Sequence, residues 1–163
     1  MIIVLDEKTK HSFFRKSDGH IYIDIPVICD GSSDDDTISF IYDTGAFITV
    51  VNRDVYETLG LHRLQHTKTV LGGYAGGAPG YLFQLPGLKI GTKLLIGVWA
   101  FSPESYSLRQ NLLGSNVIEY FCPYQDNTHD YIYFPSNSMP KPYHSEKHNF
   151  SLACDKVLFI GDE

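Results

Sequence analysis

The aspartate of the tetrapeptide Asp43-Thr44-Gly45-Ala46 is a candidate catalytic residue. The apolar segments on either side of it, residues 37–42 and 47–51, are typical of β-strands. A glycine followed by a small residue lets the turn backbone approach a ligand closely. Asp43 is therefore a candidate general base or acid. The plainer alternative is a loop aspartate that only caps its own turn.

Two further elements follow in the chain. Residues 72–80 are rich in glycine and lie between two apolar segments, which predicts a long hairpin with a flexible tip. No Gly-Lys-Ser/Thr follows the glycines, which argues against a phosphate-binding loop. Farther along, Leu112-Leu113-Gly114 precedes a predicted short helix at residues 117–121, for which Ser115 or Asn116 could be the N-cap.

In this order the three elements resemble those of the retropepsin-like aspartic proteases, the family of the retroviral proteases. The resemblance covers about residues 20–134. It implies an all-β, closed, barrel-like acid protease domain with one or two short helices. The residues to which it gives roles are catalytic Asp43, the loop and dimer-supporting Thr44, Gly45 and Ala46, the substrate-binding flap Gly73, Tyr74, Ala75, Gly76 and Gly77, and Leu112, Leu113 and Gly114 packed behind the site.

The resemblance also implies a homodimer. The chain has 163 residues, one Asp-Thr-Gly and no internal repeat, whereas a two-lobed enzyme of the pepsin type needs two copies of the motif. The second carboxylate must then come from a second chain related by twofold symmetry. In the family one member of the pair acts as general base on a shared water, and the other polarises the peptide carbonyl. We therefore expect an aspartic endopeptidase acting on peptides or proteins; the alternative is a catalytically weak dimerisation or peptide-binding module on the same fold.

Two positions depart from the family pattern. Retroviral enzymes typically have an aspartate after the tetrapeptide and an arginine after the apolar-apolar-glycine element, and here these positions are Phe47 and Ser115. Both members of the ion pair are absent together, so no buried charge is left without its partner. Phe47 could line an apolar substrate pocket or belong to the core. The predicted protease domain spans residues 1–134, and the remaining residues 135–163 form a loop and a terminal strand that could join the dimer interface.

The composition and charge argue against a nucleic-acid-binding protein and a membrane protein. A formal net charge of -6 and a sequence pI near 5.6 argue against a non-specific nucleic-acid binder. No apolar stretch approaches the roughly 20 residues of a membrane span, and the apolar start is too short for a signal peptide. We therefore expect a cytoplasmic protein with no membrane partner.

Neither a metal nor a cofactor is expected. The chain has three cysteines, Cys29, Cys122 and Cys154, which lie far apart. An odd count and wide spacing argue against a disulfide framework, so we expect reduced thiols. Two histidine pairs have a spacing of four residues, but neither lies in a convincing helix beside a third ligand.

Ala46 leads to a prediction about the working pH. Pepsin-type enzymes usually have serine or threonine at this position, and that hydroxyl stabilises the ionised carboxylate. Because Ala46 offers no such donor, we expect activity at mildly acidic to near-neutral pH. A pH profile of kcat/KM checks this, and a maximum at strongly acidic pH would contradict it.

Overall fold

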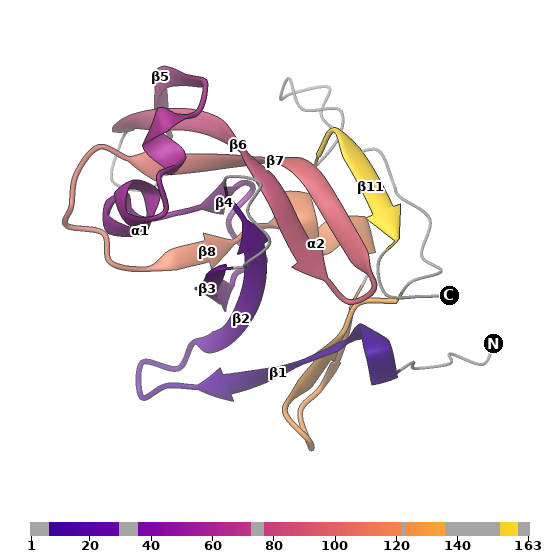
Figure 1. Ribbon diagram of the computed structural model, residues 1–163. Helices are drawn as coiled ribbons and strands as arrows, with labels where there is room; N and C mark the ends of the chain where they lie inside the picture. The colour runs from indigo at the N-terminus through magenta and orange to yellow at the C-terminus, as the bar shows by residue number, and fades with distance from the viewer. Residues whose placement is uncertain (1–6, 30–35, 73–76, 122, 136–153, 160–163) are drawn as a thin grey trace.

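The computed structural model describes residues 7–29, 36–72, 77–121, 123–135 and 154–159, and it is built mainly of β-strands (Figure 1). The strands are β1 (Lys10–Arg15), β2 (Ile21–Ile28), β3 (Asp36–Tyr42), β4 (Thr49–Val50), β5 (His66–Leu71), β6 (Ala78–Ile90), β7 (Lys93–Pro103), β8 (Asn111–Leu113), β9 (Tyr124–Asp126), β10 (Tyr131–Tyr133) and β11 (Lys156–Phe159). The helices are α1 (Arg53–Thr58) and α2 (Ser115–Phe121), with single 3-10 turns at η1 (Glu7–Thr9) and η2 (Leu61–Arg63).

Six of the strands close into a ring. In order around it, β2 pairs with β3, β3 with β8, β8 with β4, β4 with β7, β7 with β6, and β6 again with β2. The other described strands extend this ring: β5 lies on β6, β11 on β7, and β1, β10 and β9 continue outward from β2. The prediction of an all-β, closed, barrel-like domain with short helices is confirmed.

The interior of the ring is apolar because alternate residues of each strand point inward. On β2 the inward residues are Ile23, Ile25 and Val27, all with no exposed surface. Phe40 on β3 and Leu113 on β8 are likewise fully buried in the same core. Strands rich in β-branched and aromatic residues thus place their apolar face inside.

The long hairpin of β6 and β7 differs from the sequence prediction. The sequence predicts one hairpin over residues 67–85 and a second over residues 88–101 that turns at Gly91-Thr92. The second turn is present, yet β6 runs unbroken through Pro86 and takes part in both hairpins. Leu85 pairs with Val98 and Gly87 with Ile96, so Pro86 is skipped in the register. Gly97, opposite this position, has a positive φ of 72°. The proline, which has no N–H to donate, is accommodated by an irregularity in the partner strand rather than by a break.

The helices follow their predicted signals in one case and not in the other. In the sequence, Asn52 as N-cap and Gly60 as stop predict a short helix over residues 53–59. The structure agrees, since the side-chain oxygen of Asn52 accepts a hydrogen bond of 2.8 Å from the N–H of Val55, and Gly60 follows α1 with a φ of 72°. The second helix begins earlier than predicted, so Ser115 and Asn116 lie within α2. The Asn116 side chain forms hydrogen bonds with Thr49 and with the Trp99 carbonyl.

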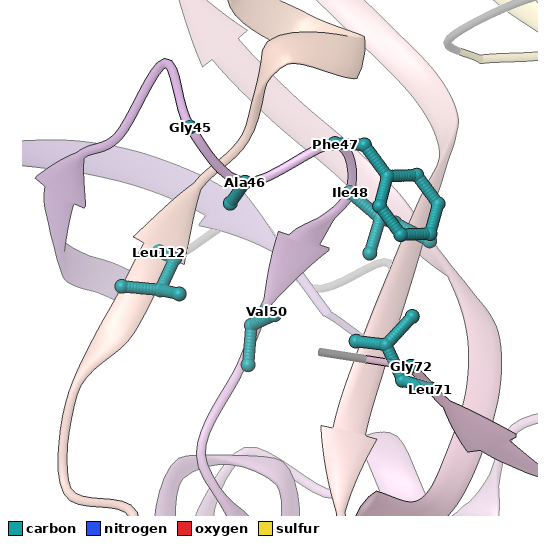
Figure 2. A pocket seen from close by; sticks show the side chains of 8 residues that line it. All are labelled: Gly45, Ala46, Phe47, Ile48, Val50, Leu71, Gly72 and Leu112. Atoms are coloured by element: carbon teal, nitrogen blue, oxygen red, sulfur yellow. The ribbon is translucent and has the colours of Figure 1, made fainter. Parts of the chain in front are cut away.

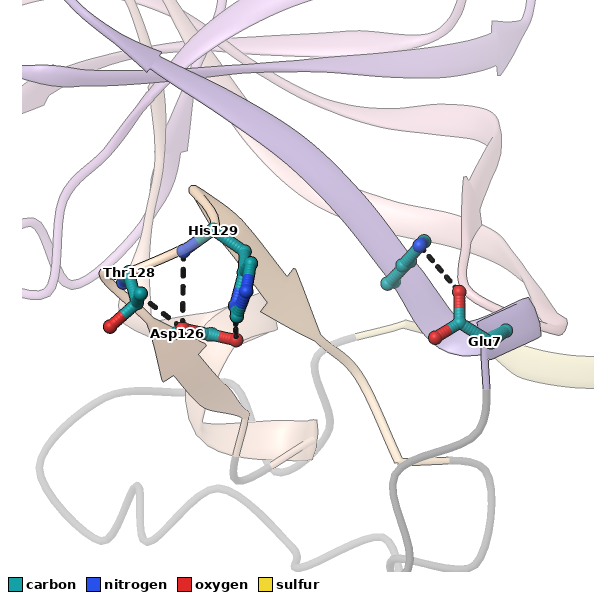
Figure 3. A network of polar contacts seen from close by, with 5 residues as sticks. Glu7, Asp126, Thr128 and His129 are labelled. Atoms are coloured by element: carbon teal, nitrogen blue, oxygen red, sulfur yellow. Dashed lines mark hydrogen bonds and ion pairs between the residues drawn. The ribbon is translucent and has the colours of Figure 1, made fainter.

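Strands β1 and β9 were not predicted from the sequence. The turn between β9 and β10 is held by Asp126, whose carboxylate accepts hydrogen bonds from the N–H groups of Thr128 (3.0 Å) and His129 (3.3 Å) (Figure 3). Its second oxygen lies 2.9 Å from Nδ1 of His129, and this contact is the main cause that lowers the pKa of Asp126. Near the start of β1, Lys10 forms an ion pair with Glu7.

The described residues also include two of the three cysteines. Cys29 and Cys154 are buried free thiols, and Cys122 lies outside the described residues. Burial raises the pKa of the Cys154 thiol to about 11, which makes that thiol a poor nucleophile. Among the described residues, no helix has the length and apolarity needed to cross a bilayer, and no three acidic, histidine or cysteine side chains gather as metal ligands do.

His11 makes the stability of this fold depend on pH. Its Nε2 accepts a hydrogen bond of 2.9 Å from the N–H of Gly91 in the β6–β7 turn, and its ring meets the edge of Phe134. Burial lowers the pKa of His11 below its ordinary value of 6.5, although a hydrogen bond to the Asp24 backbone partly opposes this. The folded state therefore keeps His11 neutral. Its contribution to stability is fully present above the unfolded pKa and is lost as pH falls through the lowered value.

We expect the free energy of unfolding to decrease between about pH 7.5 and about pH 5.5. His11→Gln should flatten that decrease, because an amide oxygen can accept the Gly91 hydrogen bond without titrating. The exposed His20→Gln is the matched control. Urea unfolding at several pH values measures the effect, and an unchanged slope in His11→Gln would show that His11 is not responsible.

Candidate active site

The loop that carries Asp43 is fixed by hydrogen bonds at its start and within itself. The N–H of Asp43 donates to the carbonyl of Leu113 on the neighbouring strand β8 (3.1 Å). Inside the loop, Oδ1 of Asp43 accepts from the N–H of Gly45 (2.9 Å), and the Asp43 carbonyl accepts from the N–H of Ala46 (3.3 Å). The carboxylate is half-buried, whereas Thr44 and Gly45 are exposed. Asp43 thus has a defined orientation and an open side.

Position 45 in this turn has little room for a side chain. A Cβ at this position would lie 3.2 Å from Oδ1 of Asp43, tighter than most such contacts. A larger residue would therefore press on the carboxylate. The predicted reason for this glycine, a close approach of the loop backbone to a ligand, stays a prediction.

Strand β8 lies behind the loop, between β3 and β4. It pairs parallel to β3 and antiparallel to β4, so a segment from residues 111–113 joins the two strands that flank the Asp43 loop. The backbone of Gly114 lies so close to Ile48 and Thr49 that a Cβ would collide with their main-chain atoms. The N–H of Ser115 then donates to the Ala46 carbonyl at 2.7 Å.

A buried polar network holds these segments together. Oδ1 of Asn116 accepts from both the N–H and the hydroxyl of Thr49, each at 3.0 Å, and the Thr49 hydroxyl accepts from the N–H of Gly114 at 3.2 Å. Nδ2 of Asn116 donates to the Trp99 carbonyl at 3.0 Å. Thr49 and Asn116 are almost wholly buried, so the network is shielded from water. No signal in the sequence points to Thr49, and Asn116 was predicted only as a helix cap.

A pocket of about 640 Å³ opens beside the loop (Figure 2). It is lined largely by apolar side chains and by glycines, namely Gly45, Ala46, Phe47, Ile48, Val50, Leu71, Gly72 and Leu112. We call it the apolar pocket. Phe47, for which core and pocket were both open, contributes to its wall.

The predicted residues behind the site divide between two surroundings. Leu113 is fully buried in the core, and Gly114 contacts the Ile48–Thr49 backbone. Leu112 instead lines the apolar pocket, because neighbouring residues of a strand point to opposite faces.

The predicted flap is described only at its base. Strands β5 and β6 pair antiparallel from His66 with Phe83 to Leu71 with Ala78, and Leu71 brings the end of β5 to the apolar pocket. Gly77 is described and lies close to the Val70 side chain. The other proposed flap residues, Gly73, Tyr74, Ala75 and Gly76, lie outside the described residues.

Residues 27–117 match the model of the aspartyl protease family. The chain belongs to that family. Its fold is similar to the crystal structure of a retropepsin-like aspartic protease from Rickettsia conorii, with a TM-score of 0.56 and 23% sequence identity over 76% of this chain and 96% of that one. A search of curated protein sequences gave no match. The resemblance to retropepsin-like aspartic proteases that the sequence suggested is thereby confirmed at the level of family and fold.

The close contact at Gly114 leads to a stability prediction for this aspartyl protease. Gly114→Ala would force a methyl group against main-chain atoms of Ile48 and Thr49, which cannot move as a flexible side chain can. We expect it to lower the free energy of unfolding by about 1–3 kcal/mol. Gly72→Ala is the control, because a Cβ there meets nothing within 4 Å. Urea unfolding of both variants measures the difference. Equal free energies of unfolding would contradict the close approach of Gly114 to the Ile48–Thr49 backbone.

Proposed function

We propose that this chain is an aspartic endopeptidase whose two catalytic carboxylates are the Asp43 residues of a homodimer. The observation that carries the proposal is the oriented Asp43 carboxylate on an open loop, next to an apolar pocket, in a chain of the aspartyl protease family. The sequence contains one Asp-Thr-Gly, so a second copy of the chain must supply the partner.

The exposure of the loop supports this assembly. Thr44 and Gly45 lie on its open side, where a second copy can approach along a twofold axis. In the retropepsin-like family the threonine of the motif reaches across the axis to the partner's loop, and we assign that role to Thr44. We assign loop and dimer support to Gly45 and Ala46 as well.

The chemistry follows from placing two carboxyl groups in contact. Like charges at close range cannot both ionise cheaply, so the pair shares one proton, as is established for aspartic proteases. The ionised Asp43 takes a proton from a water held between the two groups. The protonated Asp43 donates a hydrogen bond to the carbonyl oxygen of the scissile peptide, and the water attacks the carbonyl carbon.

The apolar pocket gives the site a preference among peptides. Its lining of Phe47, Ile48, Val50 and Leu112 favours an apolar side chain of the substrate. We propose that residues 73–77 cover the bound peptide, which would exclude water from the reaction. A cytoplasmic location stays a prediction from the sequence.

Asp43→Asn tests the catalytic role. The variant keeps the size of the side chain but cannot act as general base, so we expect peptide cleavage to fall by about a hundredfold to ten-thousandfold, or more. Asp54→Asn, an exposed change on α1, is the control and should keep full activity. Cleavage that survives in Asp43→Asn would defeat the assignment, and a dimer that binds peptide without wild-type turnover would indicate the binding module instead.

Subunit mixing tests whether the site is shared. Wild-type protein equilibrated with an excess of Asp43→Asn chains should lose activity, because most wild-type chains would then be paired with a variant chain in dimers that hold a single Asp43 carboxylate. The molar mass from light scattering should correspond to two chains at the same concentration. Activity that is unaffected by mixing, or a monomer that cleaves peptide, would rule out a dyad formed between chains.

A further inference from the structure

A second pocket, of about 310 Å³, differs in chemistry from the apolar pocket. Its lining is polar and includes two cations, with no carboxylate among its residues: Lys16, Tyr22, Ser39, Arg109, Gln110 and Asn111. We call it the basic pocket. Its residues come from β2, β3, the turn before β2 and the segment that leads into β8.

The basic pocket opens on the sheet face that also carries part of the apolar pocket. Tyr22, Ile41 and Leu112 are partners across β2, β3 and β8, which lie side by side in the ring (Figure 1). Cross-strand partners point to the same face of a sheet, and so do residues two apart on one strand, which places Ser39 on the face of Ile41. Leu112 on this face lines the apolar pocket. The two pockets also share strand β8, which gives Asn111 to the basic pocket and Leu112 to the apolar pocket.

The two cations of the basic pocket are held without being neutralised by an ion pair. Nζ of Lys16 lies 4.2 Å from the centroid of the Tyr22 ring, which itself stacks on Phe14 at 5.6 Å. The Arg109 backbone is fixed because its carbonyl accepts a hydrogen bond of 2.7 Å from Nδ2 of Asn52. Within the described ranges, neither Lys16 nor Arg109 lies within ion-pair distance of a carboxylate.

Asp18 is the acidic group nearest in sequence, and it is already engaged. Its carboxylate accepts hydrogen bonds from the N–H of His20 and the hydroxyl of Tyr22, both at 2.9 Å. These bonds, the one from His20 first, lower the pKa of Asp18, and the charge of Lys16 contributes less. Asp18 does not line the pocket, and Lys16 and Arg109 are both exposed, so that a ligand can reach them.

We propose that the basic pocket binds the side-chain carboxylate of an aspartate or glutamate in the peptide substrate, at a position that alternates with the residue held in the apolar pocket. The proposal rests on the proposed function. Alternate side chains of an extended peptide share one face and lie about 7 Å apart. Arginine and lysine bind carboxylates through charge-assisted hydrogen bonds, and the uncharged lining side chains can complete the contact. The enzyme would then select peptides that combine an apolar and an acidic residue.

The test measures binding separately from cleavage. Fluorescently labelled peptides with one apolar anchor are made in pairs, with glutamate or glutamine at each position from four before to four after the anchor. Their affinity for full-length Asp43→Asn protein is measured by anisotropy at low ionic strength. At an alternate position we expect the glutamate peptide to bind about threefold to tenfold more tightly than its glutamine partner.

A second experiment removes the two positive charges of the basic pocket. Lys16→Gln combined with Arg109→Gln, in the Asp43→Asn background, should abolish the glutamate preference and leave the affinity for the glutamine peptide unchanged. Arg63→Gln removes one positive charge at an exposed site outside the pocket and should keep the preference.

The outcomes separate this proposal from the proposed function. A glutamate preference that Lys16→Gln with Arg109→Gln removes supports the basic pocket, even if wild-type protein cleaves none of the peptides and the protease assignment fails. A preference that survives the double variant, no preference at any position, or no binding of either peptide overturns it. Cleavage of all peptides by wild-type protein without regard to glutamate would support the protease and reject the pocket.

Discussion

The contact between the backbone of Gly114 and the backbone of Ile48 and Thr49 governs the architecture of this protein. Only a residue without a side chain can bring β8 so near to the segment that leaves the Asp43 loop. That closeness lets one short strand pair with both β3 and β4 and so complete the ring. The orientation of the Asp43 carboxylate follows, because its own N–H is bound to Leu113 of that strand.

The network around this contact is uncharged. Where retroviral enzymes typically place an aspartate and an arginine, this chain has Phe47 and Ser115, and the support comes from backbone groups, Thr49 and the amide of Asn116. Neutral hydrogen bonds in a buried site do not titrate and are little affected by salt. The loss of the ion pair also frees the position after the tetrapeptide, where the Phe47 ring becomes part of the apolar pocket.

The sequence predicted the features that depend on neighbours along the chain. The cap at Asn52, the stop at Gly60, the turn between Ile90 and Lys93 and the Asp43 loop all carry local signals, and the structure has each of them. The family resemblance added the closed all-β fold, because the order of three elements is more specific than any one of them.

Features that depend on distant partners were not predictable. Asparagine is a common N-cap residue, and only the hydrogen bond with Thr49 shows that Asn116 instead joins two distant segments. Strand β9 is three residues long and forms because β10 lies beside it, so its own residues carry little signal. The basic pocket likewise joins residues from three segments, and no spacing in the sequence brings Lys16 and Arg109 together.

The pairing of β8 between β3 and β4 also orders events during synthesis. Thr49 and Asn116 are 67 residues apart, so their network cannot form until that whole stretch is available. Contacts of such long range form slowly, and a chain emerging from the ribosome makes its local hairpins first. A nascent chain therefore carries the Asp43 loop for some time without its hydrogen bond to Leu113 of β8. The surroundings of Asp43 are thus completed late in folding, after most of the domain has left the ribosome.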